Sequence, residues 1–143
     1  MEGRALSAGR RRAYAVINAC SAPVWLAMIL APRAALTRRL VDQASWLFIG
    51  LGVSYDALLV AGTARLGRPI DFRDGDAVRT ALATPDLFLA GWSHYIAFDL
   101  FVGRWIWQDA MERRRPARLA LLLTWLAGPA GLSLHLLRTR SER

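Results

Sequence analysis

The charged residues of this chain are concentrated in short blocks between four long apolar runs. The runs cover about residues 13–32, 44–64, 87–107 and 119–137. Each is close to the roughly 20 residues that an α-helix needs to cross the hydrocarbon core of a bilayer. A helical protein in water would instead distribute its charges along one face of each helix. The pattern therefore predicts an all-α integral membrane bundle of four transmembrane helices, and 143 residues predict a single domain.

The longest polar segment, residues 65–86, contains a further helical pattern. Val78 and Leu82 fall on one helical face, and Arg79 points away from it. An amphipathic stretch of this kind can lie in the plane of the membrane surface. We therefore expect a short interfacial helix over about residues 76–83.

Prolines and glycines mark where the helices begin or bend. Pro85 precedes the third run, where the missing backbone donor of a first-turn proline does little harm. Pro23 predicts a kink in the first run, because its ring clashes with the preceding turn. Gly128, Pro129 and Gly131 predict a bend and close packing in the fourth run.

The net charge of +8 comes from arginine alone, because the chain has no lysine. The arginines flank apolar runs and do not line a polar face, which argues against nucleic acid as a partner and favours the anionic headgroups of membrane lipids. A lysine-free, arginine-rich composition is typical of a GC-rich bacterial genome, so we expect the bacterial cytoplasmic membrane as the location. The side with both termini and the long loop carries more arginine, which favours cytoplasmic termini.

The third run carries three ionisable residues, His94, Asp99 and Arg104. A rise of about 1.5 Å per residue places His94 roughly 19 Å from one membrane face. Asp56 of the second run lies at roughly 18 Å and Asn18 of the first at roughly 22 Å, so these three side chains share a level. Asp99 lies at roughly 12 Å, on the same helical face as Tyr95, whereas Arg104 is near the interface.

Three interpretations of these polar groups remain open. They form interhelical hydrogen bonds, or they form a proton donor–acceptor site, in which burial shifts the pKa values of His94 and Asp56 towards the working range. The third is a metal or haem site at His94 and His135, whose depths differ by roughly 7 Å. Because the chain has two histidines and one cysteine, Cys20, we predict no metal and no cofactor.

The stretch GWSHYIAFDLFVGRW, residues 91–105, resembles the abscisic-acid-deficient-four-like family of small membrane proteins, named for a plant member needed to make neoxanthin. Further matching positions lie in the first run, the long loop and the last run: Asn18, Pro23, Trp25, Met28, Pro32, Asp71, Phe72, Val78, Leu82, Pro85, Asp109 and Gly128–Leu132. The resemblance covers most of residues 13–137.

The resemblance implies four spans and a link to carotenoid chemistry. Neoxanthin formation opens an epoxide to an allene, which requires an acid at the epoxide oxygen and a base at a nearby carbon, without net redox change. His94 and Asp99, which match the family motif, are the candidate catalytic residues. Asp56 lies outside the motif and is a candidate from its depth alone.

The candidate substrate-binding residues are aromatic and amide side chains of the first and third runs: Asn18, Trp25, Trp92, Tyr95 and Phe98. The predicted function is isomerisation or rearrangement of a carotenoid or other isoprenoid. The alternatives are a non-catalytic membrane protein that holds a partner or a lipid-like molecule, and a small transporter or proton relay. The sequence does not specify an oligomeric state.

Overall fold

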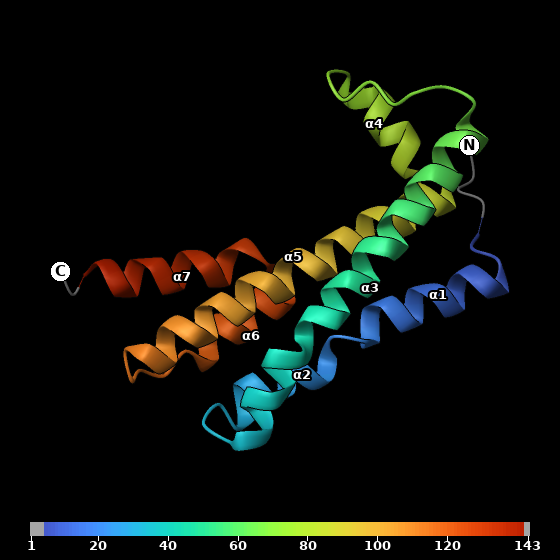
Figure 1. Cartoon of the computed structure of the whole chain (residues 1–143). Coiled ribbons are helices and arrows are strands. Elements are labelled where there is room, and N and C mark those ends of the chain that lie inside the picture. Colours follow the sequence, from blue (N-terminus) through green and yellow to red (C-terminus); the bar gives the residue numbers. More distant parts are fainter. Residues whose placement is uncertain (1–4, 142–143) are drawn as a thin grey trace. The chain divides into compact units, whose positions relative to one another are not determined.

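Between residues 5 and 141, which the computed structural model describes, the chain forms seven α-helices and no strand (Figure 1). This confirms the all-α prediction. The helices in chain order are α1 (Ala8–Ala19), α2 (Ala22–Leu30), α3 (Ala35–Leu66), α4 (Gly75–Leu82), α5 (Pro85–Glu112), α6 (Arg118–Ala127) and α7 (Pro129–Arg140).

The helices are divided between two compact units. The first unit takes in the chain up to Cys20 together with Phe48–Ile96, and so contains α1, α4 and parts of α3 and α5. The second unit takes in Ser21–Leu47 and the chain from Ala97 onward, and so contains α2, α6, α7 and the remaining parts of α3 and α5. That the whole chain forms one membrane domain stays a prediction.

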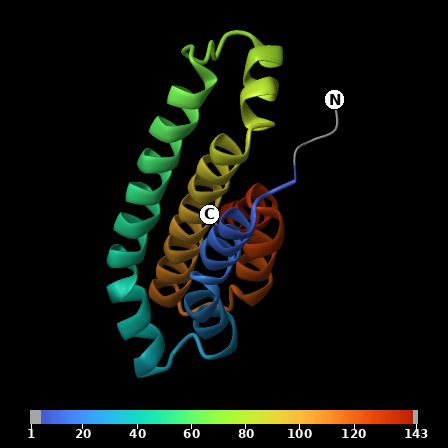
Figure 2. The ribbon, with the colours of Figure 1, turned by 90° about the vertical axis from the view of Figure 1, so that its right-hand side faces the viewer.

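In the first unit, a loop over residues 67–74 leads from α3 into α4 (Figure 2). Asp74 caps α4 by accepting a hydrogen bond from the backbone N–H of Asp76 at 2.9 Å, which satisfies one of the unpaired donors at a helix start. This helix occupies the segment expected to be helical over residues 76–83. At Gly62 of α3, a β-carbon would collide with Leu87 of α5, so the glycine permits the close approach of these two helices.

The core of the second unit is built around Trp25, which is 1% exposed. Its ring stacks on that of Trp125 with centroids 6.1 Å apart and planes inclined by 10°. The indole also lies directly against Gly103 of α5, where a β-carbon would overlap it. The turn between α2 and α3 is held by Thr37, whose hydroxyl donates to the carbonyl of Ala31 at 2.6 Å.

The first apolar run is interrupted near Pro23, where a kink was predicted. Helix α1 ends at Ala19 and α2 begins at Ala22, with Pro23 in its first turn. A proline is tolerated there because the first N–H groups of a helix have no intrahelical partner. Pro85 likewise begins α5, as predicted.

The fourth apolar run is broken completely at Gly128, whose φ of 49° is a left-handed conformation that favours glycine. Gly131 then lies against Thr124 and the carbonyl of Ala120, so α7 folds back beside α6 (Figures 1 and 2). Pro116 before α6 and Ser141 after α7 line a single cavity, which places the two ends of this helix pair together.

The sequence predicts one bent helix over residues 119–137. This prediction is wrong, because the segment is helical but does not form one continuous helix. The segment forms helices of 10 and 12 residues, each shorter than the roughly 20 residues of a membrane-spanning helix. The predicted bend is instead a reversal, because the chain at Gly128 takes up a conformation that the hydrophobicity of the run does not reveal.

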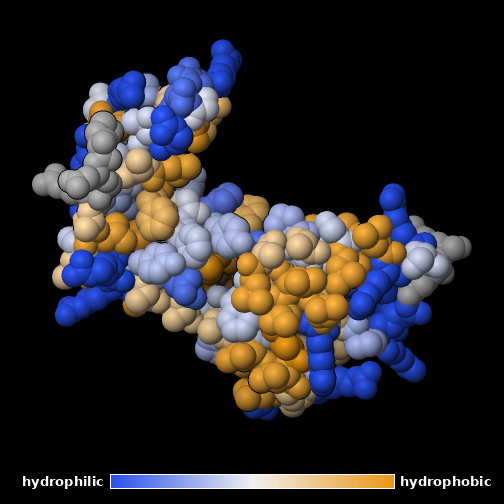
Figure 3. Space-filling view, turned by 180° about the vertical axis from the view of Figure 1, so that it is seen from behind, coloured by the Kyte–Doolittle hydropathy of each residue, from blue (hydrophilic) through white to orange (hydrophobic). Residues whose placement is uncertain are grey.

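Two helical stretches of the described chain are long and apolar enough to cross a membrane. They are Ala8–Leu30, with 23 residues, and Ala35–Leu66, with 32. Only 11% of the most apolar window of Ala35–Leu66 is buried, whereas the core helix of a water-soluble protein is mostly buried. Figure 3 shows hydrophobic residues gathered over a broad part of the face in view. Crossing by residues 87–107 stays a prediction, whereas residues 119–137 form no single helix long enough to cross.

Candidate functional site

A small apolar cavity lies in the first unit, at the wall formed by His94. Its volume is about 220 Å³, and it is bounded by α3, the 67–74 loop, α4 and α5. The lining residues are Tyr55, Leu59, Ile70, Phe72, Val78, Ala81, Leu82, Leu87, Ala90, Gly91 and His94. Tyr55 and His94 are the polar side chains of this set, so a ligand in the cavity would meet two ionisable groups on an apolar background.

The periodicity of α5 explains how His94 comes to face this cavity. Leu87, Gly91 and His94 are four and three residues apart, which aligns their side chains on one helical face. The ring of Tyr55 on α3 contacts that of His94, with centroids 5.6 Å apart and planes inclined by 48°. The sequence alone does not identify Tyr55 as a neighbour of His94, because their relative position depends on how α3 packs against α5.

A neighbouring face of α5 carries an aromatic cluster that includes two of the predicted substrate-binding residues. Trp92 and Tyr95 stack with centroids 5.4 Å apart and planes inclined by 18°. Tyr14 of α1 and Phe88 also contact the Trp92 ring, at centroid distances of 5.5 and 6.3 Å. The indole N–H of Trp92 is buried and makes no hydrogen bond within residues 5–141.

Asn18, Asp56 and His94, which were predicted to share a level along their helices, all have exposed side chains. The burial that the proton donor–acceptor interpretation required of His94 and Asp56 is therefore not seen at these two residues. Asp56 lies on a face of α3 that also exposes Val53 and Val60, at 64% and 69%. The depth of a residue along a helix follows from its position in the run, but the direction of its side chain depends on the rotation of the helix.

The remaining candidates, Trp25, Phe98 and Asp99, belong to the second unit. Trp25 is a core residue packed between Trp125 and Gly103. Phe98 is 60% exposed, and Asp99 is half-buried on α5. The structure thus brings Trp92 and Tyr95 together and places His94 beside Tyr55, whereas Trp25 lies in a packed core.

Two ionic networks were not predicted from the sequence. In the first unit, the buried carboxylate of Asp86 accepts two hydrogen bonds from Arg10, at 2.8 and 2.9 Å, and also pairs with Arg65. In the second unit, Asp109 pairs with Arg113 at 2.8 Å and with the buried His135 at 2.8 Å. The four-residue spacing of Asp109 and Arg113 on a helix was a visible signal for one of these contacts.

The pKa of Asp109 reflects these surroundings. Burial acts to raise the pKa of this carboxyl, but hydrogen bonds from Arg113 and His135, and then their positive charge, outweigh the effect of burial. The pKa of Asp109 therefore lies below its ordinary value. The ring of His135 also makes an edge-on contact with Trp105, with centroids 5.4 Å apart.

The sequence model of the ABA DEFICIENT 4-like family matches residues 12–135. The chain belongs to this family. The match covers most of the chain and confirms the resemblance expected from residues 91–105. No curated protein and no solved structure matches the chain.

The range that matches the ABA DEFICIENT 4-like family contains every candidate residue, from Asn18 to Asp99. It also contains Tyr55 and the other residues that line the apolar cavity. The match ends at His135, the partner of Asp109 in the second unit.

Proposed function

We propose that this ABA DEFICIENT 4-like protein is a multi-pass protein of the bacterial cytoplasmic membrane that binds one end group of a carotenoid or other isoprenoid and isomerises it by acid–base chemistry. The observation that carries the proposal is the apolar cavity of the first unit, in which His94 and Tyr55 are the polar lining side chains. The family's link to neoxanthin formation supplies the class of substrate.

The surface of the protein supports the membrane part of the proposal. Large hydrophobic side chains are exposed along α3, including Trp46 at 76%, and two helical stretches have the length and composition for crossing. Water-soluble monomers rarely expose contiguous apolar patches of more than a few hundred square ångströms.

The size of the cavity supports recognition of an end group. Sites for drug-sized ligands have volumes of about 300–1,000 Å³, and this cavity has about 220 Å³. A terminal ring fits a space of this size, whereas the polyene chain of a carotenoid must extend beyond it. Phe72, 78% exposed at the cavity wall, offers an apolar surface for that chain.

The proposed reaction is a rearrangement in which protons balance. A donor protonates the epoxide oxygen as the carbon–oxygen bond breaks, and a base removes a proton from a nearby carbon, so that a hydroxyl and an allene form. One proton is delivered and one is removed, with no change in oxidation state. His94 and the hydroxyl of Tyr55 are the groups in the cavity that can exchange protons, and Asp99 on the same helix is the further candidate.

The proposal is tested by co-expression with carotenoid-producing enzymes, followed by pigment analysis. His94→Ala is expected to lower product formation by about 100-fold or more, because a positioned acid or base contributes about 10²–10⁴-fold. Tyr55→Phe, which removes only the hydroxyl, is expected to lower it by about tenfold. Thr80→Ala, on the exposed side of α4, is the matched control and should leave the pigments unchanged.

The amounts of protein in the membrane fraction must be equal for this comparison. Pigments that stay unchanged when the wild-type chain meets several epoxide-bearing and other isoprenoid substrates would contradict the catalytic proposal.

A second candidate function is a non-catalytic membrane protein that holds a partner protein or a lipid-like molecule. The exposure of Asp56 between Val53 and Val60 favours it, because a carboxylate on an apolar helix face within a membrane needs a partner. Folded His94→Ala and Asp99→Asn variants that retain the full biological function would favour this candidate over the enzyme.

A further inference from the structure

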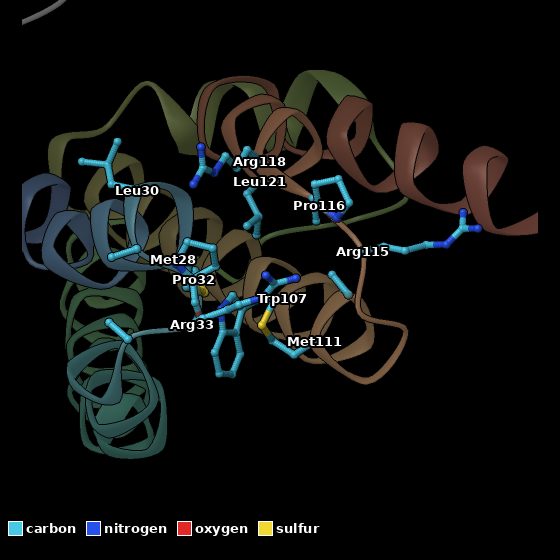
Figure 4. Close-up of a pocket in the computed structure, with 14 residues that line it drawn as sticks. Met28, Leu30, Pro32, Arg33, Trp107, Met111, Arg115, Pro116, Arg118 and Leu121 are labelled. Carbon is cyan, nitrogen blue, oxygen red and sulfur yellow. The ribbon is translucent and has the colours of Figure 1, made fainter.

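The second unit contains a larger cavity, of about 550 Å³, that the proposed reaction does not use (Figure 4). Its walls come from the end of α2, the turn before α3, the last turns of α5, and the turn that leads into α6. The lining residues are Met28, Leu30, Ala31, Pro32, Arg33, Ala34, Trp107, Ala110, Met111, Arg115, Pro116, Ala117, Arg118 and Leu121.

The inner wall of this cavity is apolar and well fixed. Met28, Leu121 and Trp107 are 0%, 1% and 7% exposed, so they belong to the packed core of the unit. The indole N–H of Trp107 donates to the carbonyl of Pro32 at 3.0 Å. This bond ties α5 to the turn that carries Arg33, and so holds one side of the cavity in place.

The rim of the cavity is positively charged. Arg33 and Arg118 line it with exposed side chains, and none of its lining residues is acidic. Arg115 also lines the cavity, but its side chain points away from Arg33, Arg118 and Trp107 (Figure 4). Two guanidinium groups above an apolar wall match a ligand that has an anionic head and a hydrocarbon tail. Arginine is well suited to phosphate, because its planar group forms two parallel hydrogen bonds with phosphate oxygens.

We infer that this cavity binds the phosphate headgroup of an anionic membrane phospholipid, with the first part of an acyl chain against Met28, Trp107 and Leu121. The two turns that form its rim, residues 31–34 and 115–118, come from polar segments predicted to lie at the same membrane face. Arginines at a membrane face attract the anionic headgroups of lipids. The inference rests on the membrane part of the proposed function, and not on its carotenoid part.

The test measures lipid binding to the purified full-length chain in detergent, by native mass spectrometry and thermal unfolding. Three probes are compared: phosphatidylglycerol, phosphatidylcholine and glycerol 3-phosphate. Phosphatidylglycerol is expected to bind about tenfold or more tightly than phosphatidylcholine, because the latter's head has no net charge. Glycerol 3-phosphate, which lacks a tail, should compete only weakly.

Variants then locate the site. Replacing both rim residues, Arg33→Gln and Arg118→Gln, should weaken phosphatidylglycerol binding by about tenfold or more. The control pair, Arg39→Gln and Arg140→Gln, removes two exposed arginines of the same unit outside the cavity and should change binding by less than about twofold. Ala34→Trp, which fills the cavity from its exposed edge, should abolish the preference between the two lipids.

Three results would overturn the inference. Equal binding of both lipids would reduce the interaction to a non-specific lipid shell. Equal losses in the two double variants would show a general charge effect, and full competition by glycerol 3-phosphate would identify a soluble phosphate ester as the ligand. If the protein is recovered from the membrane fraction, any of these three results leaves the proposed function intact. Recovery of the protein from the soluble fraction would overturn both the lipid-binding inference and the membrane part of the proposed function.

Discussion

Helix α5 carries a buried or half-buried ionic network near each end, and the two networks differ in what the helix itself contributes. Asp86 lies in the first turn, where the positive end of the helix dipole favours a carboxylate. Asp109 lies three residues before the last helical residue, Glu112, where the dipole disfavours one. The last turn of α5 contains no basic residue to offset this.

The partners of the two carboxylates follow from this difference. Asp86 is already stabilised by the dipole of its own helix, and its ion pairs join α5 to Arg10 of α1 and Arg65 of α3. Asp109 pairs with Arg113, which follows it by four residues and lies just beyond the end of α5, and with His135 of α7. The first network mainly joins helices, whereas the second mainly neutralises an unfavourable charge and fixes a histidine.

The strongest test of this comparison removes the carboxylate that joins three helices. Asp86→Asn is expected to lower the free energy of unfolding by about 2–3 kcal/mol, because it leaves two arginines together without their carboxylate. Denaturant unfolding in detergent measures the change. Asp76→Asn is the control, since its ion pair with Arg79 is exposed and contributes less than about 0.5 kcal/mol. Equal effects of the two substitutions would show that the Asp86 network does not join the helices.

A smaller loss of stability is expected from the network at the C-terminal end of α5. Asp109→Asn should lower the free energy of unfolding by about 1–2 kcal/mol at pH 7, because Arg113 and His135 lose an ionised acceptor. Since the pKa of Asp109 is lowered in the folded protein, its contribution is complete above the unfolded pKa of about 3.9 and is lost as the pH falls through the folded value.

The difference between wild type and Asp109→Asn, measured as thermal unfolding against pH, should therefore shrink as the pH falls below about 4. Asp42→Asn, an exposed position on α3 in the same unit, should give no such difference. A difference that widens as the pH falls from about 4 to about 2 would contradict the assigned direction of the pKa shift of Asp109.

The smallest effect concerns the chain just after Asp109 and Arg113. Arg114 has a φ of 56°, and the N–H of Arg115 bonds to the carbonyl of Ala110 at 2.9 Å, as in a Schellman helix end. Arg114→Gly should raise the free energy of unfolding by about 0.5–1 kcal/mol by removing the strain of a left-handed residue. Arg114→Ala retains that strain and should give no gain, so equal effects of the two substitutions would count against a strained helix end.

Local signals in the sequence predicted much of the fold. The apolar runs, the proline at the start of α5 and the break near Pro23 act over a few residues, so their effects can be inferred without knowing what packs against them. The α4 helix has the same kind of origin, with Asp74 as its cap.

Contacts between distant residues could not be predicted in this way. Arg10 and Asp86 are 76 positions apart, and Asp109 and His135 are 26 apart. The cavity beside His94 depends on Tyr55, which reaches it through the packing of α3 on α5. Hydrophobicity predicted that helices would form at these positions, but the direction of each polar side chain required the packed structure.

The reversal at Gly128 determines where the end of α7 lies relative to the start of α6. Because α7 returns beside α6, Ser141 lies at the same end of this helix pair as Pro116. Arg138 therefore lies at the end of the pair where Arg113 and Arg115 also lie. The predicted distribution of arginines between the two sides of a membrane changes with it, and the excess that favoured cytoplasmic termini disappears. A protease site placed after Ser141 and one placed before Arg118 should accordingly be cut from the same side of the membrane.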